Sequence, residues 1–425
     1  MAENWRPMWE GLGLNMENHD VLLGALGEFY VKMFVEQKNR PESMQYFDFV
    51  MSEVHGLRIK ELLDHKEKGG KVVGTFCLFV PEEVVVALDG IAVGLCAGAD
   101  FSVPIAETEL PRNLCPLIKS FYGFKLGKIC PYFEAADVVV GETTCDGKKK
   151  AYELLGDIHP VYVMEVPNKK DPADRDLWRA ELDAFIAAME ETTGKKLTAE
   201  NLAEATKKIN AKRHAIKRVH ELRWRDPTPI SGKDALLIMQ VSFYDDVERF
   251  TQSTNAVADE LEKRVAAGEG VFPKGTPRLM ISGTPMAVPN WKLHQITETS
   301  GAAVVAEEMC TGFRYYKGTV DEGAQTLEEM KEALIDHYMG INCACFTPNE
   351  PRLDDISYLY KNSGAQGIIH ATLSFCTPYL VEQGNVKKFA DKNSIPLIPV
   401  ETDYAEGDMG QLKTRIDAFI EQVSS

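Results

Sequence analysis

The 425-residue sequence lacks the features that mark membrane and secreted proteins. Its longest apolar stretch, around residues 84–99, is interrupted by Asp89 and is too short to cross a bilayer. The chain has no secretory leader pattern at its start, and its nine cysteines are an odd number that cannot be fully paired in disulfides. We therefore expect a cytoplasmic protein without a membrane partner, in which the thiols are free or bind metal.

Nucleotide and nucleic-acid signatures are also missing. The stretch GETTCDGKK at residues 141–149 resembles a phosphate loop, but five residues separate its glycines instead of four, and Lys149 replaces the magnesium-binding Ser or Thr. No G-x-G-x-x-G motif follows a predicted strand. With 47 basic and 64 acidic residues, the net charge of −17 disfavours nucleic acid as a partner. Any ATP chemistry must therefore come from another chain.

What the sequence does contain is a repeated α/β pattern. Short β-branched runs begin at residue 71 and alternate with helical or loop stretches, as in a parallel sheet. Four runs lie in each half of the chain, so we expect two Rossmann-like domains with parallel sheets that face a cleft. The eight predicted strands are KVVGTFC, GIAVGLC, ADVVVGETTC, VYVMEV, PRLMISGTP, AAVVAEEMC, QGIIHATLSFC and IPLIPVETD.

Helical segments complete the predicted organisation. After Asp171 and Pro172, apolar residues recur with the period of a helix as far as residue 226, and a third helical region spans about 232–267. The expected domains are an N-terminal helical cap at 1–70, a first α/β domain at 71–170, a helical insert or linker at 171–270 and a second α/β domain at 271–425.

The cysteines are placed where an α/β protein binds ligands. Ligands of open α/β sheets lie beyond the carboxyl ends of the strands, so thiols at these ends should line the cleft. Thiolates are soft ligands for zinc, copper(I) or iron–sulfur clusters. The cysteines at predicted strand ends are Cys77, Cys96, Cys145, Cys310 and Cys376. Those between strands are Cys115, Cys130, Cys343 and Cys345.

Core packing is the alternative for some of these residues, because free cysteine often behaves as a small buried hydrophobe. It applies best to Cys77 and Cys96, which lie in apolar runs. Zinc is disfavoured, because structural zinc sites usually bring thiols in close pairs such as C-x2-C, and here Cys343 and Cys345 alone are close in sequence. Ligands gathered from separate strand ends suit a cluster at a domain interface.

Several segments that contain the cysteines, together with the C-terminal region, carry a family resemblance. They are GTFCLFVPEE, LPRNLCPLIKSFYGF, CPYF, VVVGETTCDGKKK, EEMCTGFR, INCACFTPNEPR, and IPVETDY followed by GQLKTRIDAFIE. Together they resemble the double-cubane cluster proteins, which belong to the superfamily of 2-hydroxyacyl-CoA dehydratase and benzoyl-CoA reductase subunits. The resemblance extends from about Gly74 to Ile420.

This resemblance implies an iron–sulfur cofactor and its ligands. The dehydratase branch holds one [4Fe-4S] cluster with three cysteines, and the double-cubane branch uses further cysteines to hold an [8Fe-9S] cluster. By similarity of context, the first three ligands are Cys115, Cys145 and Cys376. We choose as the second three Cys310, Cys343 and Cys345. The reserve candidates are Cys130, Cys96 and Cys77. No catalytic side chain is identified, because the cluster itself would react.

The resemblance also implies partners and an activity. Family members receive electrons from a separate ATP-hydrolysing iron–sulfur activator protein. The leading hypothesis is therefore an anaerobic homodimeric reductase that reduces small molecules at the double cubane. One alternative is a 2-hydroxyacyl-CoA dehydratase subunit with one [4Fe-4S] cluster, against which the extra cysteines speak. The other is a non-catalytic electron carrier. The sequence does not specify the substrate.

Overall fold

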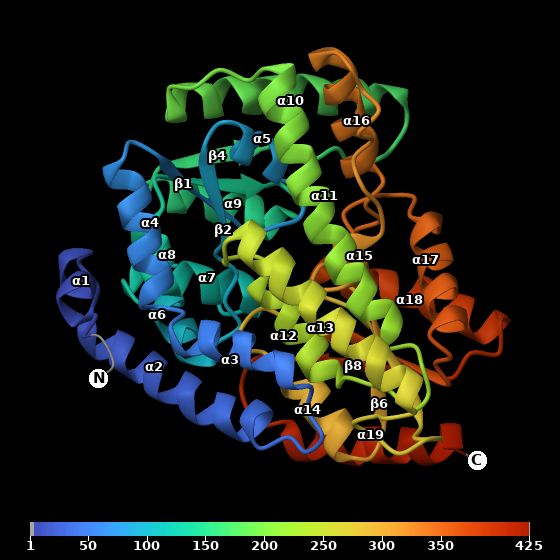
Figure 1. Cartoon of the computed structure of the whole chain (residues 1–425). Helices are drawn as coiled ribbons and strands as arrows, with labels where there is room; N and C mark the ends of the chain where they lie inside the picture. Colours follow the sequence, from blue (N-terminus) through green and yellow to red (C-terminus); the bar gives the residue numbers. More distant parts are fainter. Residues whose placement is uncertain (1–3, 425) are drawn as a thin grey trace.

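Two parallel four-stranded sheets form the centre of the protein, with helices around them (Figure 1). The computed structural model describes residues 4–424. The strand order is β2-β1-β3-β4 in the first sheet and β6-β5-β7-β8 in the second. The two orders are equivalent, since in each sheet the first strand along the chain lies between the second and the third. The predicted α/β class with two Rossmann-like sheets is confirmed.

The eight strands coincide with the eight predicted runs. They are β1 (Lys71–Thr75), β2 (Gly90–Gly94), β3 (Val138–Glu142), β4 (Val161–Met164), β5 (Arg278–Gly283), β6 (Ala303–Glu308), β7 (Gly367–Leu373) and β8 (Leu397–Thr402). Strands β5, β6 and β7 are buried throughout, as is typical of parallel strands covered on both faces. Every strand with a cysteine in its predicted run ends two or three residues before that cysteine, so the thiols belong to the loops.

The helices that precede the first sheet in the chain form the N-terminal cap. They are α1 (Arg6–Gly11), α2 (Met16–Tyr30), α3 (Gln45–Ser52) and α4 (Leu57–Glu67), with a π-helical turn at Val31–Val35 and a 3-10 turn at Glu42–Met44. This cap also contacts the second half of the molecule. The ring of Phe34 packs edge-on against Trp291 at 4.9 Å, and Arg40 forms an ion pair with the buried Asp234 at 2.8 Å. The cap therefore bridges both halves.

The region between the sheets is helical, as expected, but it contains four helices. They are α10 (Pro172–Thr193), α11 (Ala199–Leu222), α12 (Gly232–Val241) and α13 (Val247–Ala267). The third predicted helical region is thus divided. The Asp246 side chain accepts a hydrogen bond from Arg249 N–H and begins a new helix, and the carbonyl of Phe243 in the break accepts one from Gly94 N–H at 2.6 Å. The limits of the four expected domains stay a prediction.

Shorter helices connect the strands. In the first half they are α5 (Glu82–Ala87), α6 (Val103–Ala106), α7 (Pro116–Leu126), α8 (Pro131–Ala135) and α9 (Asp146–Leu155), with a 3-10 turn at Asp100–Ser102. In the second half they are α14 (Lys292–Thr299), α15 (Phe313–Tyr316), α16 (Leu327–Met339), α17 (Glu350–Asn362), α18 (Thr377–Lys392) and α19 (Met409–Ser424). Within residues 4–424, no helix combines the length and apolarity that a membrane crossing requires.

Helix α11 joins the two halves through buried charges. Lys212 and Arg213 form ion pairs at 2.5 Å with Glu82 and Glu83 at the start of α5. From the second half, the hydroxyl of Tyr338 on α16 donates to Glu83 at 2.7 Å. Breaking such a pair would leave an uncompensated buried charge, at a cost of about 3–5 kcal/mol. These contacts hold α5 of the first half against α11 and α16.

Gly283 at the end of β5 provides a test of the second sheet. Its φ of +136° suits glycine, and an added Cβ would collide with the carbonyl oxygen of Ala371 on β7. We expect Gly283→Ala to lower the free energy of unfolding by about 3 kcal/mol. The matched control is Gly384→Ala in α18, where an added Cβ meets no atom within 4 Å, and it should raise stability by about 0.5–1 kcal/mol. Equal urea midpoints for both variants would contradict this account.

Candidate functional site

All nine cysteines line one cavity of about 1590 Å³. Its walls come from both halves of the chain, since residues from the carboxyl ends of β1, β2, β3, β6 and β7 contribute to it. The cysteines are free thiols and are buried or half-buried. The cavity therefore occupies the position at which α/β sheets bind ligands.

Helix starts fix four of these thiols. Cys115, Cys130, Cys145 and Cys376 are the residues immediately before α7, α8, α9 and α18. The first two are followed directly by proline, which favours the first position of a helix. The Sγ atom of Cys145 also accepts a hydrogen bond from Lys148 N–H at 3.4 Å. The backbone N–H groups at these helix starts favour the thiolate form, but burial outweighs them at Cys130 and Cys145 and raises the pKa of both thiols.

Three of the thiols form a first set: Cys115, Cys145 and Cys376. A hydrogen bond from Cys376 holds the pKa of Cys115 below its ordinary value, and the same contact raises the pKa of Cys376. Cys145 lies near enough for its charge to act on Cys376 and for the charge of Cys115 to act on it. The set joins the first half of the chain, through α7 and α9, to the second half, through α18.

Four further thiols form a second set: Cys77, Cys310, Cys343 and Cys345. Hydrogen bonds from Cys77 and Cys345 lower the pKa of Cys310 and of Cys343, the latter to about 5. Cys345 is also within electrostatic range of Cys77 and Cys310. The sequence predicts Cys77 as a packing residue or reserve ligand, yet it lies in this set.

The two remaining thiols lie apart from these sets. Cys96 donates a hydrogen bond to the carbonyl of Phe76 at 3.0 Å and is influenced by the charges of both Cys310 and Cys115. Burial raises its pKa to about 12. For Cys130 the strongest charges are Glu134 and Lys125, and burial raises its pKa to about 11. Both thiols therefore stay protonated at neutral pH.

A buried lysine lies beside the first half of the cavity. Glu142, the last residue of β3, accepts hydrogen bonds from Cys77 N–H at 3.0 Å and from Lys148 Nζ at 3.4 Å. Burial would lower the pKa of Lys148, but Tyr152 and Glu142 raise it well above its ordinary value. The sequence left open whether the lysines after Cys145 form a solvated face. Lys149 and Lys150 are exposed, whereas Lys148 is buried in the cavity wall and stays charged.

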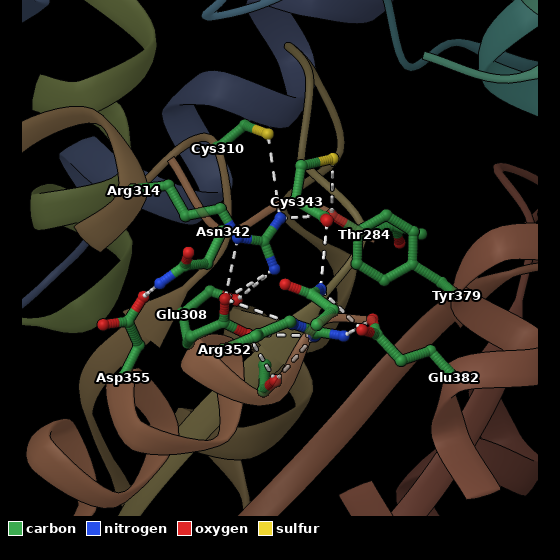
Figure 2. A network of polar contacts seen from close by, with 12 residues as sticks. Thr284, Glu308, Cys310, Arg314, Asn342, Cys343, Arg352, Asp355, Tyr379 and Glu382 are labelled. Carbon is green, nitrogen blue, oxygen red and sulfur yellow. Dashed lines mark hydrogen bonds and ion pairs between the residues drawn. The ribbon is translucent and has the colours of Figure 1, made fainter. Parts of the chain in front are cut away.

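A buried arginine contacts the second thiol set (Figure 2). Arg314 donates to Glu308 at 2.7 Å and approaches Cys310 Sγ at 3.8 Å. It also donates to the hydroxyl of Tyr379, which lies 3.8 Å from Cys343 Sγ. Because the tyrosine oxygen accepts from the guanidinium, its own proton is available to the cysteine sulfur. The network thus directs two hydrogen-bond donors at neighbouring thiols.

The carboxylate of Glu308 holds this arginine in place. Arg352 donates to its second oxygen at 2.9 Å, and Ser282 Oγ donates to the same oxygen at 2.7 Å. Burial alone would raise the pKa of Glu308, but Arg314 and Arg352 keep it below its ordinary value. Arg352 is in turn paired with Glu382 on α18. The carboxylate that positions Arg314 beside the thiols is therefore itself held by Arg352 and Ser282.

Comparison with known proteins decides the family. A family model described as 2-hydroxyglutaryl-CoA dehydratase, D-component, matches residues 77–423. The chain belongs to this family. The protein YjiM of Escherichia coli strain K12 is 38% identical over 365 residues, which cover 85% of this chain and 94% of YjiM.

Two more distant relatives carry names with a stated reaction. A benzoyl-CoA reductase subunit of Thauera aromatica is 22% identical over 363 residues, covering 83% of this chain and 91% of that protein. The beta subunit of the (R)-2-hydroxyglutaryl-CoA dehydratase of Acidaminococcus fermentans is 22% identical over 385 residues, covering 85% of this chain and 95% of that protein. The superfamily inferred from the cysteine-containing segments is thereby confirmed.

The donor atoms of this family member fit an iron–sulfur group. Cysteine thiolates are its ordinary ligands, and the cavity offers thiols of lowered pKa together with buried cations that offset negative charge. Within residues 4–424, no three or more His, Cys, Asp or Glu side chains form a group that could hold a single metal ion. The individual ligand assignments made from the sequence stay predictions.

Several residues of the site were not identified from the sequence. Glu308 and Arg314 lie in the segment EEMCTGFR, but nothing local indicates that they pair with each other and with Arg352, which is 44 residues from Glu308. Tyr379 follows Cys376 by three residues, a helical spacing that could have placed it near the cavity. The one signal in the sequence was therefore the presence of charged residues close to a cysteine. Without the fold, this signal is too weak to identify them as part of the site.

Replacing Glu308 tests whether its network is structural. Glu308→Gln would leave two buried guanidinium groups without their shared carboxylate, so we expect the free energy of unfolding to fall by about 3–5 kcal/mol. As a control, Asp336→Asn removes an exposed partner of Arg175 and should cost less than about 1 kcal/mol. Urea unfolding measures both changes. If the two variants lost the same small amount, the network would not be supporting the site.

Proposed function

We propose that this chain is an iron–sulfur reductase subunit that holds a double-cubane [8Fe-9S] cluster in its thiol-lined cavity. The observation that carries the proposal is the convergence of two adjacent thiol sets from both halves of the chain on one cavity. When bound, the cluster would supply low-potential electrons to a small molecule. The residues of the chain would hold it, exclude water and set the charge around it.

The number of thiols supports two cubanes rather than one. Three cysteines suffice for a single [4Fe-4S] cluster in the dehydratase branch, and the first set already provides Cys115, Cys145 and Cys376. The second set would be superfluous in such a protein. In the proposal its ligands are Cys310, Cys343 and Cys345, with Cys77 as the fourth thiol within reach. Cys96 and Cys130 are assigned no ligand role, since within residues 4–424 neither is joined to another cysteine by a hydrogen bond.

The buried cations support an anionic occupant. Lys148 lies beside Cys77, Cys96 and Glu142, and Arg314 lies beside Cys310 and Cys343. An uncompensated charge in such a place would be costly, so a buried cation needs a negative partner. Glu142 and Glu308 each supply a carboxylate to one of these cations, and Arg352 is paired with Glu382. Both Lys148 and Arg314 also act electrostatically on the thiols, so they would stabilise thiolates bound to iron, and hydrogen bonds to sulfur would help set the reduction potential.

Partners complete the proposed activity. Several relatives are named as subunits, among them the alpha and beta subunits of the Acidaminococcus fermentans enzyme. We propose that the present chain forms a homodimer and accepts electrons from a separate ATP-hydrolysing iron–sulfur activator. This division of labour agrees with the lack of a phosphate-loop motif in the sequence.

The second candidate is a dehydratase subunit with one [4Fe-4S] cluster. The dehydratase names of relatives favour it. It would leave the second thiol set and its arginine network without a role, and this is why we place it second. A non-catalytic electron carrier is the third candidate. A cavity of about 1590 Å³ speaks for a protein that also admits a small molecule.

Iron and sulfide content separates these candidates. After anaerobic purification we expect about eight iron atoms and about nine acid-labile sulfides per chain, because each thiol set would hold one cubane. About four irons would favour the single-cluster dehydratase subunit. A colourless protein that contains zinc would contradict the whole proposal.

Serine substitutions test the ligand sets separately. Cys115→Ser, Cys145→Ser or Cys376→Ser should remove at least about half of the iron, because serine is a poor ligand for iron in a cluster. Cys310→Ser should do the same for the second set. The matched control is Cys130→Ser. It should keep its iron, because the Cys130 thiol lines the same cavity but belongs to neither set.

The serine variants can also fail in an informative way. Full iron content in Cys115→Ser or Cys376→Ser would show that the first set is wrongly assigned. Within the second set, Cys77→Ser and Cys345→Ser are compared directly, and we expect the greater loss of iron in Cys345→Ser. The reverse order would make Cys77 the ligand. Far-ultraviolet circular dichroism checks that each variant is folded.

A further inference from the structure

The cavity continues beyond the two thiol sets to the underside of the N-terminal cap. We call this end the cap chamber and define it by its lining residues Leu26, His55, Phe124, Cys130, Tyr132 and Tyr244. These residues come from α2, the α3–α4 loop, α7, α8 and the α12–α13 break. In Figure 1, α2 and α3 run along the lower left, whereas α17 and α18 at the other end of the cavity lie on the right.

The lining of the cap chamber differs in charge from the rest of the cavity. None of its six defining residues carries a charged side chain. The charged residues that line the cavity come from the other end, on or beside β4, α9, α10, α17 and α18, for example Glu165, Lys148 and Lys388. Cys130 stays a neutral thiol because burial raises its pKa. A charged ligand would therefore find no counter-charge among these residues.

Most polar groups of the chamber are already engaged. The hydroxyl of Tyr132 donates to the carbonyl of Val54 at 2.8 Å, and that of Tyr244 lies 2.9 Å from Met51 Sδ. His55 differs. Its Nδ1 atom lies 3.0 Å from His19 Nε2, and no hydrogen bond joins its Nε2 atom to another residue within residues 4–424. Only 7% of the surface of His55 is exposed, and the residue lines the cavity.

The pairing with His19 determines which proton His55 offers. Both rings are neutral, because burial lowers the pKa of His19 to about 4 and of His55 to about 3. The Nδ1 atom of His19 is buried without a partner. A proton on His19 Nδ1 would be an unpaired N–H sealed in the core, whereas the other tautomer places the free N–H of the pair on His55, which lines the cavity. We therefore assign the His19 proton to Nε2, from which it donates to His55 Nδ1. His55 then carries its proton on Nε2, as a free donor.

We propose that the cap chamber binds a small uncharged molecule with a hydrogen-bond acceptor, such as a nitrile or a ketone, and that His55 Nε2–H donates to that acceptor. Leu26 and Phe124 would contact its apolar part. The inference deepens the proposed function, on which it rests, because this molecule would be the substrate that is reduced in the adjoining thiol-lined section. His55 acts here as a binding residue that orients the molecule.

Three probes of similar size test the chamber. Benzonitrile is neutral with an acceptor, toluene is neutral without one, and benzoate is charged. We expect benzonitrile to bind about tenfold more tightly than toluene, because it adds one hydrogen bond, and we expect no binding of benzoate. In anaerobically purified protein labelled with 15N-histidine, benzonitrile should shift the His55 ring signals and toluene should leave the Nε2 signal in place.

Variants locate the binding site. His55→Phe should lower the affinity for benzonitrile to that for toluene, and Leu26→Trp should abolish binding of both by filling the chamber. The matched control is Val381→Trp, on α18 at the other end of the cavity, where the side chain is exposed. It should change neither affinity. Equal affinities in wild type with no shift of the His55 signals, or tight binding of benzoate, would overturn the proposal.

This test is independent of the cluster. Binding of the probes requires neither iron nor reduction, so it is measured on the protein whatever its iron content. Protein that lacks iron but binds benzonitrile through His55 would overturn the proposed function and leave the chamber in place. Protein with about eight irons per chain that fails to bind benzonitrile would overturn the chamber alone.

Discussion

The buried cations beside the cavity are the constraint on which the site depends. When neighbouring thiols lose their protons, the resulting thiolates repel one another. The low dielectric of a buried site makes this repulsion large. Lys148 and Arg314 offset it from opposite halves of the chain. Each is held by a buried carboxylate, Glu142 or Glu308. Positive charge is thereby held beside both thiol sets, where it would stabilise thiolates that bind iron.

The fold distributes separate tasks to separate elements. The carboxyl ends of the strands and the starts of α7, α9 and α18 present the thiols, and α11 holds the two halves together by its ion pairs with α5. The N-terminal cap closes one end of the cavity and lines it without charge. In the proposed reductase, electrons would arrive from a partner protein, so this chain needs to provide no nucleotide site. Its own contribution would be a dry, charge-balanced pocket that is open to a neutral molecule.

The sequence was informative wherever the determining interaction was local. Alternating β-branched runs predicted all eight strands, and the strand-end rule predicted that Cys145, Cys310 and Cys376 would line one cleft. Cys77 was harder to assign, because its apolar neighbours are equally typical of a core cysteine, and its hydrogen bond to Cys310 spans 233 residues. The Glu308 network and His55 were missed for the same reason. The break between α12 and α13 combines a local cap at Asp246 with a backbone contact between Phe243 and the end of β2, and no local pattern reveals that contact.

The most direct test of the central claim is to locate the iron. Anomalous diffraction at the iron absorption edge, from crystals of anaerobically purified protein, gives the iron positions independently of any assumed ligand. The proposal predicts two adjacent groups of iron in the thiol-lined cavity, one beside Cys115, Cys145 and Cys376 and the other beside Cys310, Cys343 and Cys345. One group of iron, beside the first thiol set alone, would contradict the double cubane. Iron bound elsewhere on the chain would contradict the site.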